Sequence, residues 1–179
     1  MIYKHKYQTP NGFKDILMNS DGECLTGLWF EGSRDILKHE LNCEEKELPI
    51  FKETSKWLDI YFSGENPTFT PKYKINNLTP FRKEVLDIMN TIPFGKTITY
   101  NDISKIIAKN RGIKRMSSQA VGGAVGWNPI CIIIPCHRVV GTNGSLTGYG
   151  GGIKNKVELL KVEGNDMSKF FIPKRGTAL

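Results

Sequence analysis

The chain has 179 residues, of which 39% are hydrophobic, and this is enough to bury a core in one domain or in two small ones. No apolar run approaches the roughly 18 residues that a membrane-spanning helix requires. The formal net charge of +7 is uneven, because residues 1–78 hold 10 Lys and Arg against 12 Asp and Glu, whereas residues 79–179 hold 15 against 6. The excess in the second half indicates either a solvated basic face or a polyanionic partner.

The cysteines and histidines limit the kinds of site that this chain can form. The N-terminal residues lack the apolar core of a secretory signal, so we expect a cytoplasmic protein with reduced cysteines. The cysteines show no CxxC spacing, and no histidine has ligand spacing to a second His or Cys. We therefore expect neither a disulfide framework nor a metal site. The cysteines are Cys24, Cys43, Cys131 and Cys136.

The first half alternates between apolar and polar residues. Residues 13–19 and 24–32 are predicted to be strands, joined by the turn NSDGE. Residues 47–65 carry apolar side chains near helical spacing and predict an amphipathic helix. Residues 64–80 hold three prolines and no sustained period, which predicts a linker with a domain boundary near residue 75.

The second half is predicted to be mainly helical. One helix spans 79–93, with Thr79 as N-cap and Pro80 in its first turn. A short extended piece precedes a second helix that is capped by Thr99, with Asp102 three residues later. A basic turn, a short helix at 117–126 capped by Ser117 or Ser118, and a last helix at 153–164 follow.

A helix, a basic turn and a small-residue helix form the outline of a helix-turn-helix. This outline alone more often belongs to two packed helices that do not bind DNA. Gly122 and Gly123 cost helix stability, and such a face is worth keeping if something bulky has to approach the backbone closely. The preceding turn carries cations suited to phosphates. They are Lys109, Arg111, Lys114 and Arg115.

The stretch IIIPCHRVV places a nucleophile beside an acid–base side chain. Cys24, Cys43 and Cys131 are interpreted as inert core thiols. Cys136 differs, because Pro135 interrupts the strand before it and charged residues follow it. Adjacent side chains in a strand point to opposite faces, so a turn or a bridging water is needed before His137 can take the thiol proton.

Six separated blocks over about residues 79–164 resemble the O6-alkylguanine-DNA alkyltransferases, also called methylated-DNA–protein-cysteine methyltransferases. The blocks are TPFRKEVLDIM, FGKTITY, QAVGGAVGWNP, IPCHRVV, GSLTGYGGG and LLKVEG. The resemblance implies an α+β fold. Residues 1–75 would form a small ribonuclease-H-like sheet domain with a helix, and residues 76–179 a mainly helical, winged-helix-like domain with the helix-turn-helix.

The resemblance also implies a DNA repair reaction. A monomer would bind double-stranded DNA from the minor-groove side and rotate an O6-alkylguanine out of the duplex, with O4-alkylthymine as a further candidate substrate. The Cys136 thiolate would then displace guanine from the methyl or other alkyl carbon. A thioether has no easy hydrolysis route, so each molecule would act once, without a cofactor.

Four further residues take roles by resemblance to this family. His137 resembles the base that acts through a water molecule, and Glu163 resembles the carboxylate that orients it. Tyr100 resembles the phenol that donates a hydrogen bond to guanine N3, near the 3′ phosphate. Asn128 resembles the hinge that ties the small helix to the cysteine turn.

The remaining expected site residues line the base pocket or face the DNA. Tyr149 resembles a pocket wall, while the N–H groups of Tyr149 and Gly150 and the carbonyls of Cys136 and Val139 would read the base edge. Cys131 lies where some members have a proline beside the pocket. The DNA-binding positions are Arg111, Lys114, Arg115, Ser118, Gln119, Ala120, Gly122 and Gly123.

The chain departs from the family pattern in its DNA-facing segment. Gln119 stands where members often have an arginine that fills the space left by the rotated base. The loop at 108–118 is longer than in shorter members. Its Arg111, Lys114 or Arg115 could supply the positive charge that Gln119 lacks.

Two other functions remain open from the residues alone. A cysteine hydrolase using Cys136 and His137 would turn over, whereas an alkyltransferase is consumed at one equivalent. A lesion-binding or regulatory helix-turn-helix protein would not need the acceptor cysteine, which this chain has.

Overall fold

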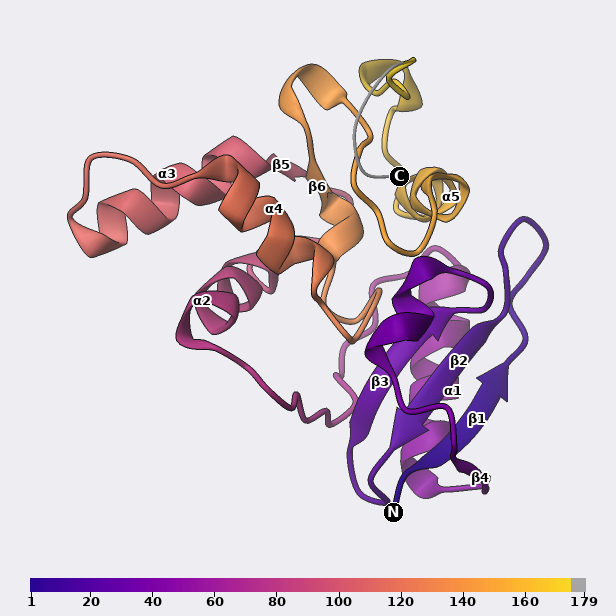
Figure 1. Ribbon diagram of the computed structural model, residues 1–179. Helices are drawn as coiled ribbons and strands as arrows, with labels where there is room; N and C mark the ends of the chain where they lie inside the picture. The colour runs from indigo at the N-terminus through magenta and orange to yellow at the C-terminus, as the bar shows by residue number, and fades with distance from the viewer. Residues whose placement is uncertain (175–179) are drawn as a thin grey trace.

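Three N-terminal strands form an antiparallel meander in the computed structural model, which describes residues 1–174 (Figure 1). They are β1 (Tyr3–Tyr7), β2 (Ile16–Ser20) and β3 (Leu25–Phe30). The short β4 (Glu44–Glu45) pairs in parallel with β1, so the order in the sheet is β3-β2-β1-β4. The predicted hairpin at the turn NSDGE is confirmed by the β2–β3 pairing. Strand β1 was not predicted, because Lys4, His5 and Lys6 break its apolar pattern.

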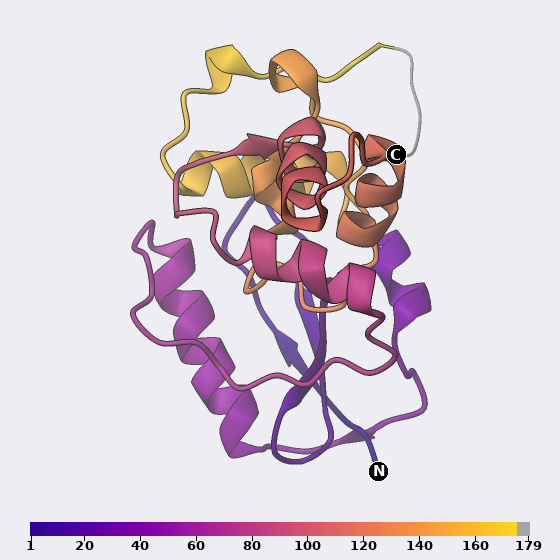
Figure 2. The same cartoon turned by 90° about the vertical axis from the view of Figure 1, so that its left-hand side faces the viewer.

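Helix α1 (Pro49–Phe62) confirms the predicted amphipathic helix. Its buried side chains recur at three- and four-residue spacing, so one stripe of the helix packs toward the sheet (Figures 1 and 2). The stripe consists of Ile50, Phe51, Thr54, Trp57, Leu58 and Tyr61. Tyr61, at the end of this stripe, is fully buried.

The segment predicted as a linker lies against the sheet. The Leu25 N–H donates to the Lys72 carbonyl at 2.9 Å, and the Lys74 N–H donates to the Leu25 carbonyl at 2.8 Å. Further along the same edge, Leu28 exchanges backbone hydrogen bonds with Pro129 and Cys131, at 2.9 and 3.0 Å. The outer edge of β3 is therefore satisfied by two segments from later in the chain.

The second half confirms the predicted helices. Thr79 caps α2 through the Arg82 N–H, and Thr99 and Asp102 form a reciprocal capping box on α3. Ser117, and not Ser118, caps α4. The elements are α2 (Pro80–Met89), β5 (Ile98–Thr99), α3 (Tyr100–Arg111), α4 (Ser118–Gly126), η2 (Cys136–Arg138), β6 (Val139–Val140), η3 (Thr142–Gly144), α5 (Ile153–Val162) and η4 (Met167–Lys169); one further short turn, η1 (Arg34–Lys38), follows β3.

Residues from both halves share one large hydrophobic cluster, which runs from Ile16 in β2 to Leu159 in α5. The α+β class is confirmed, while the domain boundary near residue 75 stays a prediction. None of the helices within residues 1–174 has the length and hydrophobicity that a membrane-spanning helix requires.

We expect Thr79→Ala to lower the free energy of unfolding by about 1 kcal/mol, because it removes the side-chain acceptor for the Arg82 N–H. Urea denaturation followed by circular dichroism measures the change. Thr68→Ala, at an exposed threonine between α1 and α2, is the matched control and should be neutral. Equal effects of the two substitutions would contradict the capping role.

Candidate active site

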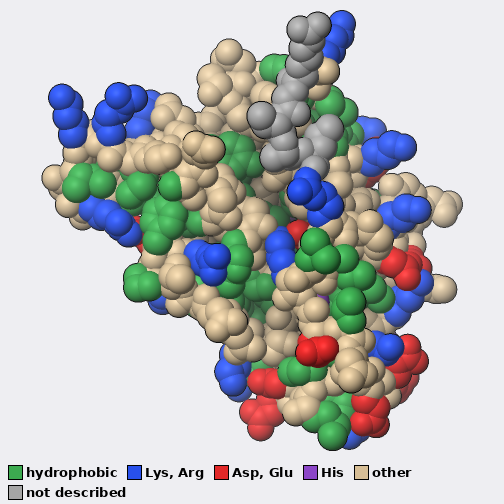
Figure 3. Space-filling view, in the orientation of Figure 1, with side chains coloured by type: hydrophobic (Ala, Val, Ile, Leu, Met, Phe, Trp, Pro, Cys, Tyr) green, Lys and Arg blue, Asp and Glu red, His purple; other side chains and the backbone are tan. Residues whose placement is uncertain are grey.

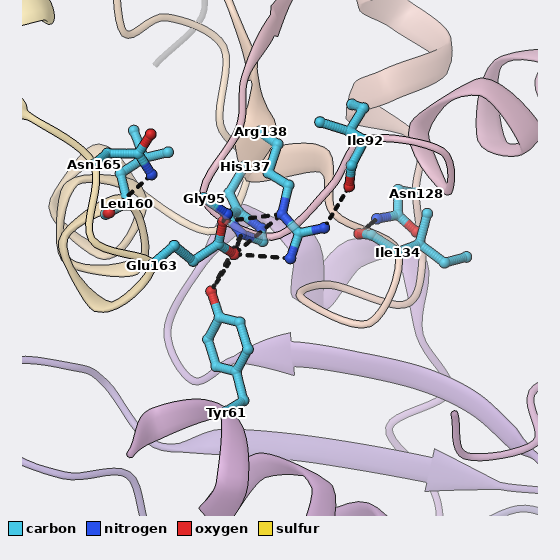
Figure 4. A network of polar contacts seen from close by, with 10 residues as sticks. All are labelled: Tyr61, Ile92, Gly95, Asn128, Ile134, His137, Arg138, Leu160, Glu163 and Asn165. Carbon is cyan, nitrogen blue, oxygen red and sulfur yellow. Dashed lines mark hydrogen bonds and ion pairs between the residues drawn. The ribbon is translucent and has the colours of Figure 1, made fainter. Parts of the chain in front are cut away.

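Cys136 lies on a tight turn at the end of a buried run. Pro135 leaves the extended conformation, with ψ of 64°, and residues Cys136–Arg138 form a single 3₁₀ turn. The Asn128 side chain holds this turn, since its Nδ2 donates to the Ile134 carbonyl at 2.9 Å (Figure 4). Its Oδ1 accepts from the Ile130 N–H at 3.0 Å. The expected hinge residue therefore bridges the end of α4 and the cysteine turn.

His137 and Glu163 meet in the interior. Both side chains are inaccessible to solvent, and His137 Nε2 lies 2.6 Å from Glu163 Oε1. Burial lowers the pKa of His137, although the nearby carboxylate works in the opposite direction. His137 Nδ1 has no protein hydrogen-bond partner among the described residues, and no direct hydrogen bond joins the ring to Cys136 there.

Glu163 is not the solvated acid that is usual at a helix end. It follows α5 as the C-cap residue and is held by donors from several segments (Figure 4). Arg138 Nε lies 3.0 Å from Oε2, the Gly95 N–H donates to Oε2 at 3.0 Å, and the Tyr61 hydroxyl donates to Oε1 at 2.8 Å. Burial opposes ionisation, but His137 and Arg138 outweigh it and lower the pKa of Glu163 to about 2.

Gly95 is required by this arrangement. Its φ is +76°, and a Cβ there would lie 2.9 Å from the Glu163 carbonyl oxygen. A side chain would therefore be strained and would crowd the backbone that presents the carboxylate.

The second buried thiol of the region, Cys131, is not a purely apolar neighbour. Its Sγ donates to Asp35 Oδ2 at 3.2 Å. The single Cys131 S–H can instead turn to the Cys136 thiolate, and this hydrogen bond, opposed by burial and helped by one from Asn128, lowers the pKa of Cys136. The backbone between the two thiols is strained, because Ile132 has φ of +68°, which a β-branched residue rarely adopts.

Asp35 and Lys38, on η1, were not anticipated as site residues. They form an ion pair, and Lys38 Nζ donates to the Gly126 carbonyl at 2.5 Å. Together with Cys136 and Tyr149 they line a cavity of only about 10 Å³. In this structure the space beside the thiol is therefore about that of one water molecule.

The expected pocket residues surround this point. The Tyr100 hydroxyl donates to the Thr147 carbonyl at 3.2 Å, and burial raises the pKa of Tyr100. Tyr149 is buried, and Gly150 lines both the small cavity and the groove outside it. The Val139 carbonyl, expected to read the base, already accepts a hydrogen bond from buried Lys156 at 2.7 Å. Burial lowers the pKa of Lys156 to about 8.

The expected DNA-facing residues lie around a groove of about 880 Å³ that opens above the small cavity. Ser118, Gln119, Gly122 and Gly123 line it, and Ala120 is exposed beside them. Lys114 and Arg115 line a neighbouring hollow of about 530 Å³ between α3 and α4. Figure 3 shows Lys and Arg side chains gathered over this end of the molecule, with acidic side chains more frequent around the sheet.

Arg111 does not lie with these residues. Its guanidinium pairs with Glu84 Oε2 at 2.6 Å and covers the Phe81 ring at 5.5 Å. It does not line the hollow that Lys114 and Arg115 line.

Comparison with known proteins agrees with this geometry. Residues 80–165 match the family model described as 6-O-methylguanine DNA methyltransferase, DNA binding domain. A methylated-DNA–protein-cysteine methyltransferase of Methanosarcina acetivorans is 39% identical over 92% of this chain and 99% of its own length, and one of Haemophilus influenzae is 35% identical over 90% and 86%. The chain belongs to the methylated-DNA–protein-cysteine methyltransferase family. It is a DNA repair methyltransferase whose acceptor is a protein cysteine.

Solved methyltransferase structures extend the match to the whole fold. The crystal structure of Mycobacterium tuberculosis OGT in complex with DNA has a TM-score of 0.75 and 32% identity, and the match covers 94% of both chains. A methyltransferase from Pyrococcus kodakaraensis, with a TM-score of 0.63 and 23% identity, shares the fold. The α+β architecture is therefore that of the methyltransferase family.

We expect Cys131→Ala to raise the pKa of Cys136, because it removes the hydrogen bond that most favours the thiolate. At pH 7 iodoacetamide should then modify Cys136 several-fold more slowly, since only the thiolate reacts. Peptide mapping by mass spectrometry across a pH series measures this change.

Two controls accompany that measurement. Cys131→Ser keeps a donor and should stay closer to the wild type, whereas Cys24→Ala removes a buried thiol just before β3 and should change nothing. An unchanged or lowered pKa of Cys136 in Cys131→Ala would show that the contact does not stabilise the thiolate.

Proposed function

We propose that Cys136 is the acceptor of the methyl or alkyl group, and that the protein takes it directly from O6-alkylguanine in double-stranded DNA. The observation that carries the proposal is that His137, on the turn of Cys136, is paired with buried Glu163 at the foot of a groove lined by α4. A thiol held in this way needs only an electrophilic carbon to react.

The proposed reaction uses the protein's own side chains. Through one water molecule, His137 Nδ1 accepts the thiol proton, and Glu163 balances the charge of the imidazolium. The Cys136 sulfur then bonds to the alkyl carbon while the bond from that carbon to guanine O6 breaks. Tyr100 donates a hydrogen bond to N3 of the departing guanine, and Asn128 holds the cysteine turn in position.

Base entry requires a rearrangement beside the thiol. A cavity of about 10 Å³ cannot hold a guanine, so Asp35 and Lys38 have to withdraw when the nucleotide rotates in. Tyr149 then forms a wall of the pocket, Gly150 offers its N–H, and Cys131 lies beside the alkyl group. The Val139 carbonyl, which already accepts from Lys156, can still accept a hydrogen bond from the base through its second lone pair.

The helix-turn-helix of α3 and α4 is proposed to bind the minor groove. Gly122 and Gly123 have space in front of them, because a Cβ at Gly122 would meet only the Tyr100 ring at 3.8 Å and one at Gly123 would meet nothing within 4 Å. Gln119 occupies the space that the rotated base leaves, with Ser118 and Ala120 beside it. Lys114 and Arg115 contact phosphates, while Arg111 contributes less because Glu84 neutralises it.

The stoichiometry follows from the product. A thioether on Cys136 is not hydrolysed, so each monomer reacts once and needs no cofactor. O4-alkylthymine is a further candidate substrate, since it carries the same kind of alkyl–oxygen bond. The relatives named above are bacterial or archaeal, which supports a cytoplasmic site of action, where their DNA lies.

We expect Cys136→Ser to abolish transfer from O6-methylguanine DNA while duplex affinity stays nearly unchanged, because the thiol lies below the groove. Intact-mass measurement should show the wild type gaining one methyl group, mapped to Cys136, and no gain in the variant. Cys43→Ser should transfer normally. Methylation of another residue in the wild type would refute this assignment.

Gln119→Ala is expected to slow transfer from duplex DNA about tenfold or more, because the unstacking cost of base rotation is no longer offset. Transfer from free O6-benzylguanine, which needs no rotation, should change little. Single-turnover rates with the two substrates measure the difference. If both rates fell equally, Gln119 would be a structural residue of α4.

A further inference from the structure

The hydrogen-bonded relay of His137 and Glu163 also contains a phenol from the N-terminal half of the chain. Tyr61 ends the buried stripe of α1, and its hydroxyl lies 2.8 Å from Glu163 Oε1 and 3.2 Å from His137 Nε2 (Figure 4). The ring is itself fixed, because it stacks on Trp57 at 5.4 Å and meets Phe94 edge-on at 5.9 Å. The hydroxyl therefore has little freedom to move away from the two side chains.

Counting the protons assigns a direction to each contact. Glu163 is ionised, so its carboxylate only accepts, and the 2.6 Å contact requires a proton on His137 Nε2. That nitrogen cannot also accept from Tyr61, so the hydroxyl donates to Glu163. Its oxygen then faces the Nε2–H as a second, longer acceptor. In the neutral ring this leaves the lone pair on Nδ1, the nitrogen without a protein partner among the described residues.

We propose that Tyr61 is a positioning residue of the methyl-transfer reaction, whose hydroxyl holds Glu163 and His137 Nε2 so that Nδ1 is presented to the acceptor thiol. The inference rests on the role of His137 proposed above. It makes the N-terminal half a part of the reaction, because α1 supplies a contact that no residue of the cysteine turn provides.

The consequence for His137 follows from what the hydroxyl does to Glu163. A donor to the carboxylate draws negative charge away from the imidazole, so Tyr61→Phe leaves a carboxylate that stabilises the imidazolium better. The lost contact to Nε2 acts in the opposite sense but is longer. The pKa of His137 should therefore rise, and the acid limb of the pH–rate profile should move to higher pH.

The experiment is a pH series of single-turnover methyl transfer from O6-methylguanine duplex DNA by the full chain. Tyr61→Phe should move the midpoint of the acid limb to higher pH and reduce transfer on that limb by about threefold or more relative to its own plateau. A midpoint that stays where it is in the wild type, or moves to lower pH, would overturn the proposal and leave Tyr61 as a packing residue.

Tyr7→Phe is the matched control. The Tyr7 hydroxyl also donates to a carboxylate, Asp59 Oδ1 at 2.7 Å, and Asp59 lies on α1 as Tyr61 does. The control removes the same kind of hydrogen bond on the same helix, away from the relay. It should change thermal stability without moving the acid limb.

A second measurement needs no variant. Long-range ¹H–¹⁵N NMR of the wild-type protein should show neutral His137 with its proton on Nε2, and a proton on Nδ1 would overturn the proposal even if Tyr61→Phe does not fold. Failure of the wild type to methylate Cys136 would instead count against the proposed function. The two ideas therefore fail by different observations.

Discussion

The buried negative charge of Glu163 is the constraint on which the arrangement of the site depends. A carboxylate removed from water is costly unless charged and hydrogen-bonding partners replace the solvent. Here the partners come from three separate segments: Tyr61 from α1, Gly95 from the turn before β5, and the adjacent His137 and Arg138 from η2. If any of these segments moved away, the Glu163 carboxylate would lose a hydrogen-bond or charge partner. The requirement to satisfy one carboxylate thus fixes the imidazole of His137 next to Cys136 on their common turn.

The positive charge of the second half is less available to DNA than its total suggests. Arg138 neutralises Glu163 inside the protein, and buried Lys156 donates to the Val139 carbonyl. Arg111 is paired with Glu84, and Lys83 with Asp87. We therefore propose that two exposed cations beside α4, Lys114 and Arg115, contribute more to DNA binding than the net charge suggests. Because Gln119 on α4 is uncharged, the proposed attraction for phosphates rests still more on this pair.

Local signals made much of the fold predictable. Caps such as Thr79 and Thr99 depend on neighbouring residues alone, and the helices that they begin were predicted correctly. Strand β1 was missed because its polar residues are only half covered, and the segment after α1 was taken for a linker because its pairing partner, Leu25, lies far earlier in the chain.

The site was predictable where its residues lie in motifs. Cys136, His137 and Glu163 were expected, and the structure brings His137 and Glu163 together. Tyr61 and Asp35 reach the site only through long-range packing, and no spacing in the sequence indicates this. Lys156 did carry a signal, because it shares the buried face of α5 with Leu159, Leu160 and Glu163. A lysine in that register indicates a satisfied interior cation.

The backbone pairing of Leu28 with Pro129 and Cys131 has a consequence for how the molecule comes apart. These hydrogen bonds attach the segment before the cysteine turn to the edge of the N-terminal sheet. One hydrophobic cluster includes residues from both sides of this contact. Elements joined in this way tend to open as one cooperative unit in native-state exchange. We therefore expect the amides of β3 and those of residues 130–136 to exchange in the same opening event. Partial melting of the sheet would then also release the turn that carries Cys136, the proposed acceptor.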